Sequence, residues 1–518
     1  MNVGSPLPNS KSRAATLAAQ AFFVASPFVL LLAVSLAIGR SALSATPVWT
    51  DELDYWRAIY AWLHAGFRVG YSGIGEMAAP LGTLSVHGIA PILLYGLPAK
   101  LFGWSFVSIA LYNALWISAG ALVFCLLNRP KARTALLLGI SLTVYAPAVL
   151  YCATSMTELA NYGLLIFYLA FVTRLKRARA KAQTPAGTLP TARVGLPWLL
   201  LGALTVLLCC AYRITYMGLW IPLIWVALDG RLNAKMAGAL VGAIVLSALT
   251  YYLTSRLSSP FETGFLYNFL RTGSFGLSVR MFLSHAKANV LDYFVRTPGS
   301  VMEGVQRILY CAVAGLSLLG AWMRPERQSG RIRLRFGWDG FSMLAFLTLF
   351  LPFAIVVCAY ETNDWSDYRT LAPFLWLVIA GYLLRGRRLV PAVYFAGSLA
   401  ILGLLLSIPP VGAYGDEARF TPAPFTAEAQ ALCQAVQFDE TAADPFDNSV
   451  RTDVFTLETV ASLAPGIGIQ TGWFTEANVG QCRWILTDHL KIPLAGYELV
   501  VKNRAGSVYR KLSAQEQE

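Results

Sequence analysis

The sequence predicts an all-α polytopic membrane protein, with about eleven transmembrane helices and a small C-terminal α/β domain outside the membrane. Hydrophobic residues make up 56% of the 518 residues and charged residues only 13%, whereas soluble domains carry about 25% charged residues. The apolar residues gather in runs of roughly 18 to 22 residues, the length that crosses a hydrocarbon core. Because these runs are continuous rather than alternating, they favour helices over the strands of a β-barrel.

Eleven apolar segments are the expected spans. They cover residues 18–39, 107–127, 134–152, 158–173, 195–211, 215–229, 235–254, 306–322, 339–360, 370–384 and 389–408. These spans make residues 1–408 a membrane domain. Residues 409–518 are far more polar, and about a hundred residues suffice for a small soluble domain. The end of this domain predicts a β-hairpin, with strands at 497–501 and 508–512.

The formal net charge of +13 would suggest a nucleic-acid partner in a soluble protein. Here the Lys and Arg residues cluster between spans. With eleven spans these basic clusters all fall on one side of the membrane, as those of cytoplasmic loops do. The sequence therefore predicts a cytoplasmic N-terminus, an extracytoplasmic C-terminal domain and no nucleic-acid partner. The short loops favour a bacterial inner (plasma) membrane.

One apolar segment, residues 87–103, resembles a span but does not fit this topology. Counting it would invert several later loops, and it contains Pro91, Pro98 and Lys100. We expect a juxtamembrane or re-entrant segment instead. The first outer loop then extends over residues 40–106.

The first outer loop also contains an amphipathic stretch. Leu53, Trp56, Tyr60 and Leu63 recur at helical spacing, with polar residues between them. This pattern predicts a helix lying flat in the membrane interface, with its Trp and Tyr rings at the depth of the headgroups.

Acidic side chains stand at two places on the predicted outer face. Asp51 and Glu52 follow the first span, and Glu158 begins the fourth. Helix capping is the structural alternative at both places, because the free N–H groups and the dipole of a helix N-terminus favour anions. A carboxylate at the mouth of a span is nevertheless costly unless it is hydrated or paired. Acids from different helices on one face could therefore define one pocket.

Two arginines and a histidine are candidates for binding an anion on the same face. Arg369 begins a span on the side where positive charge is rare, and Arg213 lies in another outer turn. Each could be a snorkelling or salt-bridged side chain, or a phosphate ligand, since guanidinium forks match phosphate oxygens. His87 lies at the start of the re-entrant segment, although a lone His is more often structural.

The order and sidedness of these motifs resemble the GT-C superfamily of integral-membrane glycosyltransferases. Protein O-mannosyltransferases and the lipid A aminoarabinose transferase belong to this superfamily. The acidic pair Asp51-Glu52 is similar to the acidic loop after its first span, and Glu158 is similar to its second outer acid. The resemblance extends over residues 47–175, and over the rest of the chain only in topology.

Two further stretches carry the resemblance less closely. Residues 87–103 resemble the family's HPP…LFG stretch, but residues 88–90 are Gly-Ile-Ala where its prolines would begin. Tyr368-Arg369 resembles a later RY-like motif in reversed order, which makes Tyr368 a candidate for the phosphate site.

The resemblance implies a polyprenyl-phosphate-sugar donor and a glycan, lipid or protein acceptor at the outer face. Inverting sugar transfer needs a base for the acceptor hydroxyl, and we expect Asp51 to serve. The phosphate leaving group needs cations, which Arg369, Arg213 or a bound divalent metal could supply. Glu52 and Glu158 could position the acceptor or hold that metal. No cofactor is certain from the sequence.

Two cysteines lie in the predicted outer domain, Cys433 and Cys482. Because an extracytoplasmic domain is in an oxidising compartment, we expect them to form a disulfide.

Two other classes of protein share some of these features. A flippase or transporter of lipid-linked glycans would place ionisable residues or broken helices at mid-membrane, whereas these charges gather at the mouths of spans. A glycan polymerase or ligase would share the outer acids and arginines but use a lipid-diphosphate oligosaccharide. The lipid-linked donor on which activity depends would separate these functions.

Overall fold

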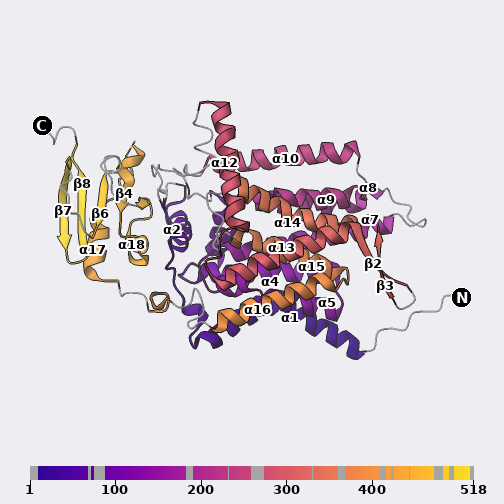
Figure 1. Cartoon of the computed structure of the whole chain (residues 1–518). Helices are drawn as coiled ribbons and strands as arrows, with labels where there is room; N and C mark the ends of the chain where they lie inside the picture. The colour runs from indigo at the N-terminus through magenta and orange to yellow at the C-terminus, as the bar shows by residue number, and fades with distance from the viewer. Residues whose placement is uncertain are drawn as a thin grey trace.

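Long apolar helices form the body of the molecule, which is a computed structural model (Figure 1). It describes residues 10–67, 72–74, 84, 88–182, 191–230, 233–257, 273–328, 331–359, 368–407, 416–421, 425–442, 444–471, 482–488 and 495–513. Within these residues, 8 helices are long and apolar enough to cross a membrane. They are α1 (Ser10–Ile38), α4 (Ser108–Asn128), α7 (Glu158–Ala182), α8 (Thr191–Tyr212), α10 (Ala234–Ser255), α13 (Val301–Trp322), α14 (Gly340–Ala359) and α16 (Leu389–Ser407).

Three predicted spans are helical but shorter or divided. One contains α5 (Ala132–Thr143) and α6 (Ala146–Tyr151), and another contains the 3-10 helix η3 (Ile214–Leu219) and α9 (Trp220–Ala227). The third is α15 (Tyr368–Leu384), which contacts α5, α7, α14 and α16 and has nearly all its side chains buried. All eleven predicted segments are therefore helical, and the all-α membrane fold is confirmed. The number that cross the membrane stays a prediction.

The segment expected to be re-entrant forms one short apolar helix. It consists of a π-helical turn, η2 (Ile92–Gly96), that continues into α3 (Leu97–Phe102). At 1.5 Å per residue this helix is about 16 Å long, roughly half of a hydrocarbon core. Its length is thus compatible with the expected re-entrant segment.

A six-stranded sheet lies at one end of the bundle, at the left of Figure 1. Its strands in spatial order are β1 (Ser72–Ile74), β5 (Gly468–Thr471), β4 (Ser449–Thr452), β6 (Trp484–Thr487), β8 (Gly506–Lys511) and β7 (Tyr497–Asn503). The first four strands are parallel, and β8 and β7 form the antiparallel hairpin that the sequence predicts. Helices α17 (Ala427–Ala435) and α18 (Leu457–Ser462) complete this α/β unit, together with the short η5 (Glu417–Arg419) and η6 (Pro445–Asn448).

The sheet is not confined to the C-terminal residues. Strand β1 comes from the first outer loop and pairs with β5, with Ser72 opposite Ile469. The expected boundary at residue 409 therefore omits a strand that belongs to the same sheet. We refer to the sheet with its helices as the outer domain.

Helix α2 (Thr50–Ala65) lies between the bundle and the outer domain (Figure 1). Leu53 and Trp56 are buried, and so is Arg57 on the polar side. The guanidinium of Arg57 donates to the backbone carbonyls of Val460 and Leu463 at 2.9 and 2.8 Å. The helix is present as predicted, and protein covers part of its polar side as well as its apolar side.

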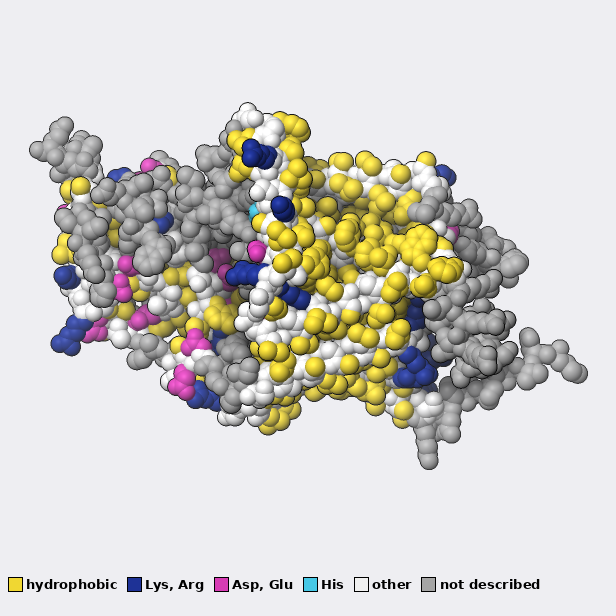
Figure 2. Space-filling view, in the orientation of Figure 1, with side chains coloured by type: hydrophobic (Ala, Val, Ile, Leu, Met, Phe, Trp, Pro, Cys, Tyr) yellow, Lys and Arg dark blue, Asp and Glu magenta, His cyan; other side chains and the backbone are white. Residues whose placement is uncertain are grey.

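The side chains on the surface of the molecule differ between the bundle and the outer domain. Hydrophobic side chains cover the visible face of the bundle, Asp and Glu gather on the outer domain, and Lys and Arg also occur at the opposite end (Figure 2). The remaining elements are η1 (Ala42–Ser44), α12 (Phe275–Phe294), β2 (Met323–Gln328) and β3 (Arg331–Phe336). Strands β2 and β3 form a hairpin at the end of the bundle remote from the sheet (Figure 1).

Candidate functional site

Four charged residues at the ends of helices meet where the bundle faces the outer domain. Asp51 lies in the first turn of α2, Glu158 begins α7, and Arg369 is the second residue of α15. Arg213 precedes η3, directly after α8 ends. Each residue stands at or next to a helix end, so the helix holds its backbone in place. Its side chain can then extend beyond the end of the helix. We call Asp51, Glu158, Arg213 and Arg369 the charged cluster.

The charged cluster is a chain of ion pairs that alternate in sign. Nη2 of Arg369 lies 2.7 Å from Oδ2 of Asp51, and Nε of Arg369 lies 3.4 Å from Oε1 of Glu158. Nη2 of Arg213 donates to the same Oε1 at 2.8 Å. Two carboxylates thus balance two guanidiniums, which satisfies the requirement that charges out of water be paired.

Burial in the charged cluster is graded. The exposed fraction of the side chain is 2% for Glu158, 7% for Arg213, 22% for Arg369 and 37% for Asp51. Asp51 is therefore the carboxylate that a molecule from outside reaches first. Oε2 of Glu158 is buried and takes no hydrogen bond from any residue in the described part of the chain. A buried carboxylate oxygen without a donor costs about 1–3 kcal/mol, so this atom is suited to a hydroxyl or amide of a ligand.

Two tyrosines border the charged cluster, and the sequence reading did not single them out. Tyr55 lies one helical turn after Asp51, and its hydroxyl is hydrogen-bonded to that of Tyr212. The hydroxyl of Tyr212 also contacts that of Thr157. Burial raises the pKa of Tyr55 well above its ordinary value, and the charges of Glu158 and Asp51 raise it further. Tyr55 is thus a neutral hydrogen-bonding group. Its spacing from Asp51, which puts both on one helix face, was the available signal.

Glu52 does not belong to the charged cluster, which corrects its expected role in positioning an acceptor or a metal. Its oxygens bind the guanidinium of Arg419 at 2.8 and 2.9 Å. They also accept from the backbone N–H groups of Val48, Trp49 and Ser155 at 2.7–3.0 Å. Both members of the ion pair are 0% exposed. Glu52 therefore joins the start of α2 to the segment that leads into the outer domain.

Two other phosphate candidates are not placed in the charged cluster. The hydroxyl of Tyr368 lies 3.1 Å from that of Tyr145 and is buried within the bundle. This contact gives no support to a phosphate ligand at Tyr368. His87 lies outside the described residues.

The expected disulfide is wrong. Cys433 in α17 and Cys482 beside β6 are both buried and free. Sγ of Cys482 donates to Oε1 of Gln470 at 3.1 Å, and burial raises the pKa of Cys433 to about 11. Both thiols are therefore buried, and Cys433 stays protonated at neutral pH. The spacing of two cysteines in a sequence does not show whether the fold brings them together.

The charged cluster does not fit a divalent metal ion. Over the described residues, no group of three or more His, Cys, Asp or Glu side chains could hold one. The carboxylates of Asp51 and Glu158 are each bound by a guanidinium, which occupies the place of a cation between them. The positive charge of the site is therefore supplied by Arg369 and Arg213.

The fold and the charged cluster define a polytopic helical membrane protein with a paired acid–arginine site at one end of its bundle, beside a sheet domain. No protein-family model and no curated protein sequence matches the chain.

Several solved structures are similar in overall arrangement. ArnT from Cupriavidus metallidurans bound to undecaprenyl phosphate is 12% identical, with a TM-score of 0.49, over 94% of this chain and 98% of that chain. An Archaeoglobus fulgidus oligosaccharyltransferase in complex with Zn and sulfate is 13% identical, with a TM-score of 0.46, over 92% of this chain and 68% of that one. The same organism's AglB, in complex with an inhibitory peptide and a dolichol-phosphate, is 12% identical, with a TM-score of 0.41, over 92% and 69%.

Proposed function

We propose that the protein is an inverting glycosyltransferase. It moves a sugar from a polyprenyl-phosphate donor to an acceptor hydroxyl of a glycan, lipid or protein at the outer face of a bacterial inner membrane. The observation that supports this proposal is the direct pair between Asp51 and Arg369. A half-exposed carboxylate at the mouth of the bundle stands 2.7 Å from a guanidinium. A base and a phosphate ligand are the two groups that this transfer requires.

The pair between Asp51 and Arg369 suggests an order of events. While the guanidinium of Arg369 binds Oδ2 of Asp51, that oxygen is engaged and cannot take the proton of an acceptor hydroxyl. The donor's phosphate competes for Arg369, since a guanidinium binds phosphate as well as carboxylate. Binding of the donor then releases Asp51, so that the base becomes active only when the leaving group is in place.

The transfer step balances without a further reactant. The acceptor oxygen forms a bond to the anomeric carbon while the bond from that carbon to the phosphate oxygen breaks. Asp51 takes the acceptor's proton as a general base. Arg369 and Arg213 stabilise the charge that grows on the leaving phosphate. The free Oε2 of Glu158 can accept a hydrogen bond from a neighbouring sugar or acceptor hydroxyl.

The test of this function is donor cleavage by the purified protein with envelope extract as acceptor. Mass spectrometry follows the released lipid phosphate, with a monosaccharide on a lipid monophosphate in one arm and an oligosaccharide on a lipid diphosphate in the other. We expect release in the first arm only. We also expect Asp51→Asn to lower its rate by about 10²- to 10⁴-fold, the usual contribution of a general base.

The matched control is Glu428→Gln, which removes an exposed carboxylate of α17 far from the charged cluster. It should release lipid phosphate at the rate of the wild type. Full activity of folded Asp51→Asn would refute the assignment of the base. Release only from the diphosphate donor would instead indicate a polymerase or ligase, and transbilayer movement of an intact donor would indicate a flippase.

A further inference from the structure

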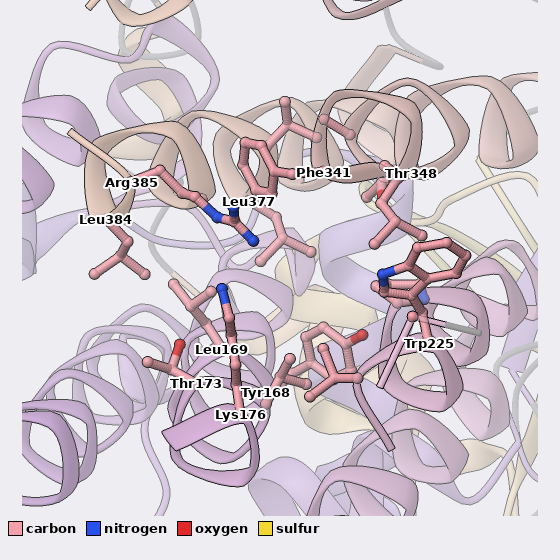
Figure 3. Close-up of a pocket in the computed structure, with 18 of the residues that line it drawn as sticks. Tyr168, Leu169, Thr173, Lys176, Trp225, Phe341, Thr348, Leu377, Leu384 and Arg385 are labelled. Carbon is pink, nitrogen blue, oxygen red and sulfur yellow. The ribbon is translucent and has the colours of Figure 1, made fainter. Parts of the chain in front are cut away.

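A second site lies at the other end of the same helices. A cavity of about 800 Å³ opens between α7, α9, α14 and α15, and Figure 3 shows the side chains that line it. Glu158 begins α7, and Lys176 of the cavity lies about 27 Å further along that helix at 1.5 Å per residue. Arg369, the second residue of α15, and Arg385, which directly follows that helix, are separated by about 24 Å in the same way. The cavity is therefore distinct from the charged cluster.

Two cations converge in this cavity. The side chains of Lys176 and Arg385 point toward each other across it (Figure 3). Arg385 is also stacked on Phe341, with its guanidinium carbon 4.4 Å from the ring centroid. Like charges that share one cavity repel each other unless an anion lies between them.

The carboxylates near the cavity are already engaged. Asp229 is bound by Arg179, with Nε to Oδ1 at 2.7 Å. Asp339 lies 2.5 Å from Nη1 of Arg387. Over the described residues, neither Lys176 nor Arg385 has an ion pair. Asp229 and Asp339 are thus bound by other arginines, and Lys176 and Arg385 converge without a carboxylate of the described residues bound to either.

Apart from Thr173, Thr348, Arg177 and the ion pair of Arg179 with Asp229, the remaining wall of the cavity is mostly apolar. Leu169, Trp225, Phe341 and Leu377 line it, and Figure 3 shows Leu169 and Leu377 near the two cations and Trp225 at the other side of the cavity. A soluble inorganic ion would leave this surface uncovered. A molecule with an anionic head and an apolar body would contact both parts, as ligands in mostly apolar pockets with a few polar groups do.

We propose that this cavity binds a phosphate-bearing molecule. Its phosphate lies between Lys176 and Arg385, and its apolar part lies against Trp225 and Phe341. Anionic phospholipids and soluble phosphate esters share this head chemistry. Basic pockets between membrane helices do bind anionic headgroups. Cations that only fix the topology of the chain would need no cavity and no convergence.

The experiment compares lipids on the purified full-length protein by native mass spectrometry. Phosphatidylglycerol and phosphatidylcholine are supplied at equal concentration, and glycerol phosphate is tested separately as the soluble ester by its effect on thermal unfolding. We expect the wild type to retain phosphatidylglycerol over phosphatidylcholine. The double variant Lys176→Gln/Arg385→Gln should lose this preference by about tenfold or more, since it removes both charge-assisted hydrogen bonds to the phosphate.

Two controls make the result specific to the cavity. Arg388→Gln removes an exposed cation near the same helix end that does not line the cavity, and it should leave the preference unchanged. The charge-preserving variant Lys176→Arg/Arg385→Lys should retain it. Stabilisation by glycerol phosphate that the double Gln variant abolishes, without any lipid preference, would identify a soluble ester as the ligand. Equal retention by the wild type and the folded double Gln variant, or no binding of either phosphate by the wild type, would overturn the proposal.

Discussion

At the scale of single residues, the two carboxylates of the charged cluster have different tasks. Asp51 is 37% exposed and pairs with one arginine, whereas Glu158 is 2% exposed and lies against two. An exposed ion pair contributes little to stability, about 0–1 kcal/mol. Removing one partner of a buried pair costs about 3–5 kcal/mol, because the other charge stays buried. Asp51 should therefore matter mainly for reaction rate, whereas Glu158 should matter for the fold as well as for binding a ligand hydroxyl.

This contrast gives a testable difference in stability. We expect Glu158→Gln to lower the free energy of unfolding by about 3–5 kcal/mol, since Arg213 would lose its buried counterion. Asp51→Asn should lower it by about 1 kcal/mol or less. Unfolding of the purified protein in mixed micelles by increasing SDS would measure both. Equal stability of the two variants would show that the difference in burial between Asp51 and Glu158 does not determine how much each ion pair stabilises the protein.

Sequence alone could place Asp51 and Glu52 together but could not distinguish them. Adjacent residues on a helix point about 100° apart, so one carboxylate faces the mouth of the bundle and the other faces Arg419. The identity of a partner 367 positions away is not a local property. The sequence indicates Arg369 and Arg213 because a cation on the predicted outer face is unusual. No local pattern distinguishes Tyr55 from the other aromatic residues.

At the scale of elements, α2 is the joint between the bundle and the outer domain. Arg57 gives its guanidinium to four backbone carbonyls, those of Val460, Leu463, Ala464 and Ile467, at 2.5–3.1 Å. These carbonyls belong to the end of α18 and the turn before β5. Arg57 thereby satisfies carbonyls that the end of a helix leaves without partners. Burial lowers the pKa of Arg57 to about 10, so it remains charged at neutral pH.

Replacing Arg57 should therefore loosen the outer domain. We expect Arg57→Met to increase amide hydrogen exchange in α18 and β5 by about tenfold or more, because charged hydrogen bonds contribute about 1.5–3 kcal/mol each. Exchange in α4 and α7 should not change. Mass spectrometry of the exchanged peptides would measure the effect.

The control for this prediction is Arg40→Met. Arg40 also contacts the segment that leads into the outer domain, through Glu417 at 3.5 Å, but both side chains are largely exposed. Its loss should leave exchange in α18 and β5 as in the wild type. Unchanged exchange in Arg57→Met would show that the other contacts of α2 are sufficient to hold the outer domain.

At the scale of the whole molecule, the charged cluster and the cavity mark opposite ends of one bundle. If the basic loops are cytoplasmic, the charged cluster and the outer domain face the outside. The hydrophobic surface between these ends (Figure 2) is the part that lipid covers. On the two proposals above, α7 and α15 would hold a sugar donor at one end of the bundle and a phosphate-bearing molecule at the other.

This arrangement predicts which residues a membrane-impermeant maleimide reaches. In right-side-out vesicles of a protein with Cys311→Ser and Cys358→Ser, we expect Glu440→Cys in the outer domain to be labelled. Arg388→Cys, at the other end of the bundle, should react only after the vesicles are opened. Both positions are exposed, and the native cysteines that remain are buried. The reverse pattern of labelling would invert the proposed orientation.

The sequence predicted the bundle better than the outer domain, and the reason is physical. Crossing a hydrocarbon core requires a local property, a run of apolar residues, so all eleven predicted segments proved helical. The hairpin of β7 and β8 is also local, and it was predicted. Strand β1 has three residues and pairs with β5 far along the chain, and no local pattern specifies such a pairing. Whether Cys433 and Cys482 lie close together likewise depends on contacts between residues that are far apart in the chain.

The contact of Arg57 with the outer domain has a consequence for biosynthesis. Arg57 and Val460 are 403 positions apart, and β1 likewise pairs with a strand near the end of the chain. At 5–20 residues per second, translation of the intervening chain takes about 20–80 s. During that time β1 has no strand to pair with and Arg57 has no carbonyls to bind. The sheet can therefore close only after β5 and its neighbouring strands have been made and have reached the same side of the membrane as β1.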